Sequence, residues 1–570
     1  MQKLNLQKNW RASAVALTCL PFAATLFPQQ SCAGEPQSPP TKPNIVFILC
    51  DDLGWRDLGC TGSNFYETPN IDRLAARGMK FMDAYASSPV CSPSRSSILT
   101  GQYPVHTGIT DWIPGGSNIL GPDPDMSVLE PNFVQNLATN GVTIAQALKA
   151  GGYATCFAGK WHLGLDPKSW PLPEGFDYNY GGWAAGNPRA YGMGGYFSPW
   201  HNPYLADAPK GTFLTDELTT KTIEFIKQEA KAGKPFFADL SFYAVHEPIE
   251  AKPEYIQKFK EKAHRLGLDT QPQFVEDEPW MQEYPSFKER IIQADPVYAG
   301  LIYSVDENVG RILDTLKELG IYSNTIVVFS SDNGGLATAE GSPTSNLPLR
   351  DGKGWTYEGG VRVPLIVCWP GVTSPGAACT FPVVNTDFYP TFLDIAGLPQ
   401  RPEQSVDGVS LAPLLRGEPA INQPVIYWHY PHYGDQGGTP SSALRMGDWK
   451  LVQFYGDNHV ELYNLASDVE ERRDLAKALP EKTAELINLL NEWKFKTQAK
   501  IPEINPYYNP GEFAEFLRQH HIDNKWSGAL KSFRENYDRY FSTNVFDPNW
   551  LPATMENYHR LYGVYSGKGE

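Results

Sequence analysis

The chain has 570 residues, of which 41% are hydrophobic, 20% are charged and 13% are aromatic. This length exceeds what one hydrophobic core usually holds, so we expect more than one domain, and the composition excludes a mostly disordered chain. The formal net charge of −16 opposes binding to nucleic acid and to anionic membranes. An anionic substrate would therefore need a local cluster of basic side chains.

The first 33 residues have the pattern of a secretory signal peptide. Three basic residues precede an apolar run over 12–27, and a segment of small residues ends at Ala33. The run is too short to span a membrane. We expect an exported protein, periplasmic or secreted, whose formal charge falls from −16 to −19 when the three basic residues are removed. Cys32 leaves a lipid anchor as the less favoured alternative, because the residues before it lack the usual pattern.

A Pro-rich linker over 34–43 leads into alternating strand and helix patterns. The apolar run 44–54 is typical of a buried parallel strand, and 67–78 follows as a helix with Pro69 in its first turn. Further helices are predicted near 143–150 and over 216–231, 296–319 and 386–396, and further strands over 153–160, 235–246, 325–335 and 363–369. This alternation predicts an α/β catalytic domain over 44–424, with a mostly parallel central sheet flanked by helices.

The pattern changes beyond about residue 425. Short strands followed by a helix over 478–496 predict a smaller C-terminal α+β subdomain with an antiparallel sheet, over 425–499. Residues 500–570 are rich in Tyr, Phe and Trp and lack clear periodicity. We interpret them as an aromatic-rich extension that wraps over the main body.

Six cysteines follow the predicted signal peptide: Cys50, Cys60, Cys91, Cys156, Cys368 and Cys379. In an exported protein an even number is compatible with three disulfides, although the sequence does not define their connectivity. Cys368 and Cys379 flank a turn region and are the favoured pair. If Cys91 serves the chemistry, at least one other cysteine is unpaired.

Acidic residues follow two of the predicted strands. Asp51 and Asp52 end the first strand, and Asp332 and Asn333 end another, followed by two glycines. One Asp-Asp pair alone is more often a polar turn. Because the carboxyl ends of parallel strands meet at one edge of a sheet, the two groups together predict an oxygen-rich site that suits Ca²⁺ or Mg²⁺ better than zinc.

Basic residues and one cysteine complete the candidate site. Cys91 begins a predicted helix, and Arg95 lies one turn further along, a spacing compatible with a disulfide or with a reactive thiolate. Lys160 and His162 lie two apart after a strand, which would place them on one side of an extended segment, and His246 ends another strand. Lys353 lies in a Gly-rich loop. Each alone is usually structural or solvated, but together they predict a pocket for a tetrahedral anion.

Cys91 to Arg95 read CSPSR, which matches the sulfatase signature Cys-x-Pro-Ser-Arg. The further matches, in the same order, are NIVFILCDDLG, TPNIDRLAARG, GKWHLG, SDNGG, GKGWTYEGGVRVP and ELYNLASDVEERRDLA. The chain resembles the type I, formylglycine-dependent sulfatases of the alkaline-phosphatase-like superfamily from about residue 43 to 480.

This resemblance implies a sulfatase whose Cys91 is converted by a maturation enzyme to Cα-formylglycine, and whose hydrated aldehyde attacks the sulfate. It also implies one Ca²⁺, with Mg²⁺ as the poorer alternative, held by Asp51, Asp52, Asp332, Asn333 and an oxygen of the converted Cys91.

The remaining roles are also carried over from the family. Arg95 would stabilise the hydrate, and Lys160 would contact both the hydrate and the sulfate. His162 would deprotonate the remaining hydroxyl to expel sulfate. His246 and Lys353 would hold the sulfate and protonate the leaving alcohol.

Two alternatives remain open: a phosphomonoester or phosphonate hydrolase of the same superfamily, and a non-catalytic carbohydrate-binding protein on the same scaffold. Export and the aromatic content favour a sulfated sugar as substrate. Specificity is expected from loops over 111–128, 180–210 and 264–290, with Trp112, Trp183 and His201 as candidate pocket walls.

Overall fold

The computed structural model describes residues 42–115, 126–137, 141–276, 288–401, 404, 407–419, 425–506 and 508. The predicted signal peptide, most of the linker and nearly all of the C-terminal extension lie outside these residues. Within the part of the chain that is described, no helix is long and apolar enough to cross a membrane.

One sheet of eight strands forms the centre of the fold, in the order β12-β2-β11-β10-β1-β7-β5-β6. The strands are β1 (Asn44–Cys50), β2 (Met79–Phe81), β5 (Ala154–Gly159), β6 (Tyr178–Tyr180), β7 (Phe236–Ser241), β10 (Thr325–Ser331), β11 (Leu365–Cys368) and β12 (Ala377–Cys379). The five strands from β10 to β6 are parallel, whereas β11 is antiparallel to both of its neighbours. The predicted α/β class with a mostly parallel sheet is confirmed.

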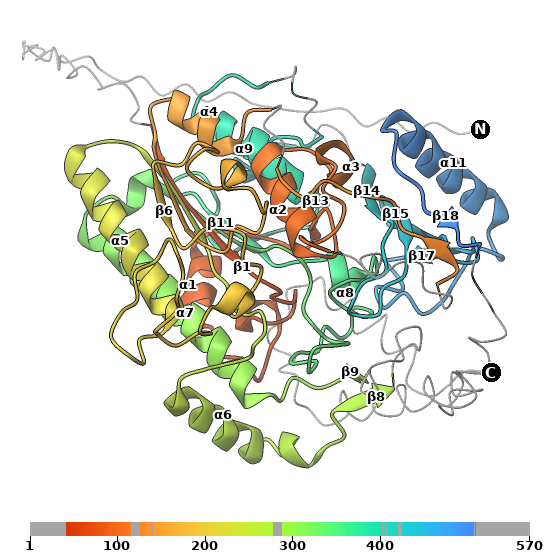
Figure 1. Cartoon of the computed structure of the whole chain (residues 1–570), viewed down its shortest axis with the longest axis horizontal. Coiled ribbons are helices and arrows are strands. Elements are labelled where there is room, and N and C mark those ends of the chain that lie inside the picture. The colour runs from red at the N-terminus through yellow and green to blue at the C-terminus, as the bar shows by residue number, and fades with distance from the viewer. Residues whose placement is uncertain are drawn as a thin grey trace, which may run out of the picture. The chain divides into compact units, whose positions relative to one another are not determined.

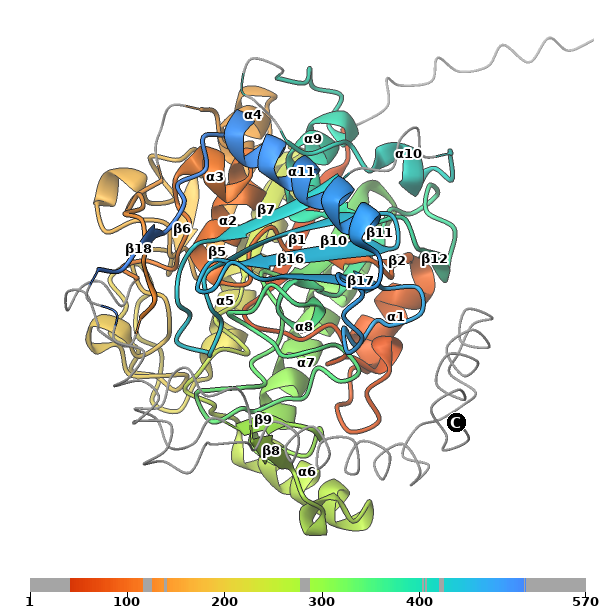
Figure 2. The same ribbon diagram turned by 90° about the vertical axis from the view of Figure 1, so that its right-hand side faces the viewer.

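Helices cover both faces of this sheet (Figures 1 and 2). One face carries α1 (Pro69–Arg77), α5 (Leu214–Ala232), α6 (Pro253–Arg265) and α7 (Pro296–Glu318), and the other carries α2 (Cys91–Thr100), α4 (Ile144–Ala150) and α9 (Phe388–Ile395). Side chains of β1 alternate between these layers, because Val46 and Ile48 pack with the first set while Phe47 and Leu49 pack with the second. Burial on both faces explains why this strand is a continuous apolar run.

A second, antiparallel sheet follows in the order β14-β15-β16-β17. Its elements are β14 (Val425–Tyr430), β15 (Ser441–Met446), β16 (Trp449–Phe454) and β17 (Val460–Asn464), with α11 (Pro480–Lys496) against one face (Figure 2). Leu486 and Leu490 of α11 pack on Leu444, Leu451 and Leu462. The other face packs against the main body through residues such as Trp428 and Trp355.

Short elements complete the chain: β3 (Ala84–Tyr85), α3 (Pro104–Thr107), β4 (Val128–Leu129), β8 (Phe274–Glu276), β9 (Lys288–Arg290), α8 (Glu358–Val361), β13 (Val383–Val384), α10 (Ala412–Leu415) and β18 (Glu503–Ile504). β18 pairs with β4, so the described start of the C-terminal extension contacts the segment around Val128.

A buried group of charges connects the second sheet to α8. Lys450 of β16 places Nζ 3.0 Å from Glu358 Oε1 and 2.9 Å from Glu471 Oε1, and all three side chains are fully buried. Glu358 begins α8, five residues after Lys353. The C-terminal sheet is thereby attached to the loop that supplies a predicted site residue.

Substitution of Lys450 by Met should destabilise the protein. We expect a loss of about 3–5 kcal/mol in the free energy of unfolding, because two buried carboxylates would lose the ammonium group that contacts both, although Arg362 would remain beside Glu358. Urea unfolding followed by tryptophan fluorescence measures this loss. Lys496→Met is the control, since Lys496 pairs with Glu492 on the surface, where such a pair contributes about 1 kcal/mol or less. Equal losses for both variants would contradict the prediction.

The favoured disulfide between Cys368 and Cys379 is wrong. All six cysteines of the described chain are free. Cys368 ends β11 and Cys379 ends β12, and both strands pair with β2, which therefore lies between them. Neighbouring strands are about 4.8 Å apart, so two cysteines separated by a whole strand exceed the reach of a disulfide. Cys368 instead lies 3.4 Å from the hydroxyl of Tyr322.

Candidate active site

The predicted site residues lie together at the carboxyl edge of the central sheet and at the start of α2. Asp51 and Asp52 follow β1, and Asp332 and Asn333 follow β10 directly. Lys160 and His162 follow β5, and the loop after β7 supplies His246. Strands end earlier than the sequence predicted, because the chain turns at these polar residues rather than extending through them.

Asp51 and Asp332 hold the basic groups behind Cys91. Lys160 Nζ donates to Asp51 Oδ2 at 2.7 Å, and Arg95 Nη2 lies 3.5 Å from Asp51 Oδ1. Arg95 Nε donates to Asp332 Oδ2 at 2.8 Å, and its Nη1 donates to the carbonyl of Lys160 at 2.7 Å. These buried, charge-assisted bonds fix the guanidinium at one position.

Asp52 organises the opposite side of the site. Lys353 Nζ donates to Asp52 Oδ2 at 2.8 Å and lies 3.0 Å from His246 Nε2. Asn333 Nδ2 donates to Asp52 Oδ1 at 2.8 Å, and the Asp52 amide donates to Asp332 Oδ1 at 3.1 Å. Asp52 has a φ of 62°, in the left-handed region that non-glycine residues rarely adopt. The backbone therefore turns sharply where the two carboxylates meet.

Cys91 is the first residue of α2 and is 3% exposed. Its Sγ lies 3.2 Å from His162 Nδ1, and the other ring nitrogen, His162 Nε2, contacts the carbonyl of Ile113. His162 has a φ of 58°, so the expected extended segment is wrong: the left-handed turn directs the imidazole toward Cys91. Ser92 Oγ donates to the His162 carbonyl at 2.8 Å and anchors this turn.

Burial and neighbouring charges set the pKa values of the site. Burial raises the pKa of Asp51, and it raises that of Asp332 to about 7 although Arg95 opposes the shift. Burial also opposes ionisation of Asp52, but the Lys353 ammonium lowers the pKa of this carboxyl below its usual range.

Both histidines of the site are neutral at neutral pH. Burial, and then the Lys353 charge, lower the pKa of His246 to about 4. Burial and Lys160 lower the pKa of His162 well below its usual value. Each ring can therefore accept a proton from a bound group.

The arrangement fits a divalent cation. Asp51 Oδ1 and Asn333 Oδ1 are buried and have no hydrogen-bond partner among the described residues. One ligand atom each of Asp51, Asp52 and His246 lie within 4.8 Å of one another. When all three are ionised, the carboxylates of Asp51, Asp52 and Asp332 balance the cations Arg95, Lys160 and Lys353, so a bound dication would make the site positive. Orphaned oxygen donors of this kind suit Ca²⁺.

Sequence reasoning missed two carboxylates beside this cluster. Glu340 Oε2 lies 4.0 Å from Lys353 Nζ, and Glu247 Oε1 lies 3.9 Å from His246 Nδ1. Glu247 directly follows His246 in the sequence, a signal that could have identified it. Glu340 is in a loop without a recognisable pattern, so only the fold places it here.

The candidate pocket walls differ in position. Trp112 immediately precedes Ile113, and the carbonyl of Trp183 accepts from the His162 amide at 3.2 Å, so both adjoin His162. His201 is exposed, and its Nδ1 lies 3.3 Å from Asp207 Oδ2.

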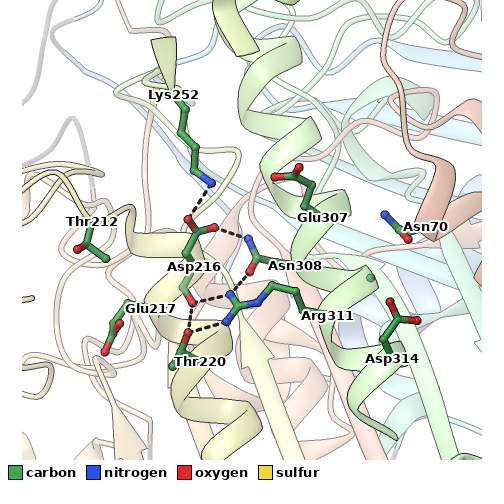
Figure 3. A pocket seen from close by; sticks show the side chains of 11 residues that line it. Asn70, Thr212, Asp216, Glu217, Thr220, Lys252, Glu307, Asn308, Arg311 and Asp314 are labelled. Carbon is green, nitrogen blue, oxygen red and sulfur yellow. Dashed lines mark hydrogen bonds and ion pairs between the residues drawn. The ribbon is translucent and has the colours of Figure 1, made fainter. Parts of the chain in front are cut away.

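A separate hollow of about 600 Å³ lies between α5 and α7 (Figure 3). Its polar side chains bond to one another: Lys252 and Asn308 both contact Asp216, and Arg311 contacts Asn308 and Thr220. None of the ten predicted residues lines it. The chemistry is therefore assigned to the edge of the sheet and not to this hollow.

Solved structures share this architecture. The crystal structure of Ps i-CgsB in complex with k-i-k-neocarrahexaose has a TM-score of 0.64 and 27% identity, covering 86% of this chain and 99% of that chain. The phosphonate monoester hydrolase of Agrobacterium radiobacter has a TM-score of 0.54 at 19% identity, covers 81% of this chain and 100% of that chain, and shares the fold alone. The fold is that of the alkaline-phosphatase-like superfamily.

Sequence comparisons define the family. A model described as Sulfatase matches residues 43–398, and one described as N-sulphoglucosamine sulphohydrolase, C-terminal, matches 351–499. A sulfatase from Formosa agariphila is 34% identical over 529 residues, which is 80% of this chain and 90% of the relative. N-acetylgalactosamine-6-sulfatase from Mus musculus is 31% identical over 458 residues, 76% of each chain. The chain belongs to the sulfatase family and is a sulfuric ester hydrolase.

Proposed function

We propose that this protein is an exported sulfatase that hydrolyses sulfate monoesters of a sulfated carbohydrate, using Ca²⁺ and a formylglycine formed from Cys91. The observation that carries the proposal is the position of Cys91: at the start of α2, 3.2 Å from His162, among buried carboxylates and cations. The carbohydrate is supported by relatives whose names specify a sulfated sugar and by the structure of Ps i-CgsB with an oligosaccharide.

Asp51, Asp52, Asp332 and Asn333 would hold the cation, together with an oxygen at position 91. When bound, Ca²⁺ supplies charge that polarises the sulfate and the attacking oxygen. The contacts of Asp51 with Lys160 and of Asp52 with Lys353 would then loosen, because carboxylate oxygens shared with a dication attract the ammonium groups less. Both lysines would become available to the sulfate oxygens.

The Cys91 sulfur occupies the place where the attacking oxygen of the converted side chain would lie. His162, neutral and within hydrogen-bond distance of that position, accepts the proton that must leave before sulfate is expelled. The carbonyl of Ile113 fixes the second ring nitrogen and so the ring orientation. Arg95, held by Asp332, stabilises negative charge on the same side chain.

Lys353 and His246 serve the leaving group. Asp52 raises the pKa of Lys353 well above its usual value although burial opposes the charge, so this ammonium remains protonated. It lies 3.0 Å from the neutral imidazole of His246, and the pair can share a proton at the place where the leaving alcohol departs.

Removal of metal tests the proposal. We expect chelated protein to lose sulfate release from 4-nitrophenyl sulfate and to regain it with Ca²⁺ and, less well, with Mg²⁺. Ca²⁺ at a hundred times its dissociation constant should stabilise the fold by about 2.7 kcal/mol, seen as a higher melting temperature. A chelated enzyme that retains full activity and the same melting temperature would contradict the cation.

Sulfate and phosphate esters of the same alcohol should be assayed side by side. We expect faster release of sulfate, and faster phosphate release would favour the phosphohydrolase alternative.

Export is tested separately, by determining the amino-terminal residue of the protein from the native host. We expect it to be residue 34, the first residue after the predicted signal peptide.

A further inference from the structure

We propose that the sugar ring that carries the scissile ester bears no second anionic group, because partly exposed carboxylates lie beside Lys353 and His246, which would hold the sulfate. The proposal rests on the sulfatase function above and narrows its substrate. We call these three carboxylates, Glu247, Glu340 and Asp435, the rim.

Glu340 is placed at the rim by its loop. Its Oε2 lies 4.0 Å from Lys353 Nζ, and its Oε1 accepts from Gln436 Nε2 at 2.6 Å. The side chain is 29% exposed, so the carboxylate meets both the sulfate-binding lysine and solvent. Glu340 has a φ of 53°, a strained conformation for a residue with a side chain. The fold maintains this strain and so holds the carboxylate against Lys353.

Glu247 and Asp435 extend the same rim. Glu247 Oε1 lies 3.9 Å from His246 Nδ1, and its side chain is 36% exposed. Asp435 is exposed and directly precedes Gln436, the partner of Glu340. Burial and then Glu340 raise the pKa of Glu247, as they raise the pKa of Asp435, while Lys353 opposes both shifts, so the three carboxylates share one electrostatic environment.

The cations of the site pair with its own buried carboxylates. Arg95 contacts Asp51 and Asp332, Lys160 contacts Asp51, and Lys353 contacts Asp52. With Ca²⁺ bound, this buried part of the site is positive and suits one sulfate, whereas the rim is negative. A carboxylate or second sulfate on the sugar would meet the rim acids, but hydroxyl groups can donate to them and an ammonium group would be attracted.

The test uses one ester in three charge states. In glucosamine 6-sulfate the nitrogen on C2 is a cation, in its N-acetyl form the same nitrogen is uncharged, and in its N-sulfo form it carries an anionic group. The galactosamine 6-sulfates provide the same three charge states. Release of the 6-sulfate is followed by product analysis. 4-Nitrophenyl sulfate and the same ester with a ring carboxylate form a parallel pair. We expect kcat/KM for the uncharged or cationic form to exceed that of the anionic form by about ten-fold.

Glu340→Gln assigns the effect to the rim. The ratio of kcat/KM between the uncharged and the anionic ester should fall about five-fold in this variant. Because both enzymes meet the same two esters, differences in intrinsic reactivity cancel. Asp314→Asn is the matched control. Asp314 lies near the end of α7, and α7 leads into the start of β10. Asp314 is therefore at the edge of the sheet opposite to the site. Its ratio should equal that of the unmodified enzyme.

The outcomes separate the two levels of the proposal. Preference for the anionic esters, or a ratio that Glu340→Gln leaves unchanged, overturns the rim inference while the sulfatase function stands. Absence of sulfate release from every ester, in protein whose Cys91 is shown by mass spectrometry to be converted, overturns the function itself.

Discussion

Cys91→Ala should abolish sulfate release while leaving the fold intact. Loss of a nucleophile acting in concert with its base reduces turnover on the order of 10⁶-fold, and here the only atoms removed are the sulfur and the group formed from it. Cys91 is buried but small, and its Sγ contacts the His162 ring, so the melting temperature should change by a few degrees at most. Initial rates with 4-nitrophenyl sulfate and a thermal scan of the same sample measure both effects.

Ser92→Ala is the neighbouring control. Its hydroxyl accepts from the Ile113 amide at 3.1 Å and donates to the His162 carbonyl, so its loss should perturb the histidine without removing the attacking group. We expect a far smaller decrease in kcat than for Cys91→Ala. Comparable activity in Cys91→Ala and the unmodified protein would exclude a nucleophile at position 91.

Asp51→Asn should reduce kcat/KM at least about 10³-fold through loss of the cation. The amide is nearly the same shape as the carboxylate but carries no charge, and Asp51 Oδ1 is one of the buried oxygens without a hydrogen-bond partner among the described residues. The variant should also lose the rise in melting temperature on addition of Ca²⁺. Calorimetric titration of the metal-free protein provides an independent measurement.

Comparison of the two variants separates their causes. Cys91→Ala keeps all four oxygen ligands from the strand ends and should still be stabilised by Ca²⁺, whereas Asp51→Asn should not. A Ca²⁺ response that disappears in Cys91→Ala and persists in Asp51→Asn would place the cation elsewhere.

The fold was predictable because its central strands have unambiguous patterns. β1 is buried on both faces, so its sequence is apolar without interruption, and α7 begins with Asp295 as a helix cap that accepts from two backbone amides. The antiparallel direction of β11 was not predictable, because a short apolar run has no signal for strand direction. The disulfide failed for a related reason: β2 inserts between β11 and β12 from far earlier in the chain.

The site was predictable where its residues lie at strand ends or match family motifs. Asp51 and Asp332 lie far apart in sequence but adjacent in space, because β1 and β10 are parallel neighbours. Glu340 lacks any such signal, since its position depends on a left-handed backbone conformation and on contacts with Lys353 and Gln436. The residues that gather at the edge of the sheet could thus be predicted from sequence, whereas the position of Glu340 required the folded chain.

All ten residues of α2 are buried, and Cys91 is 3% exposed. If Cys91 is converted as proposed, an oxidising enzyme would have to reach a thiol that the packed helix covers. Conversion would therefore have to precede folding, and the two processes would compete in time. Chains that fold first would be stable and correctly folded but permanently inactive. The specific activity of a preparation would therefore measure the fraction of chains that were converted before folding, and not the fraction that is folded.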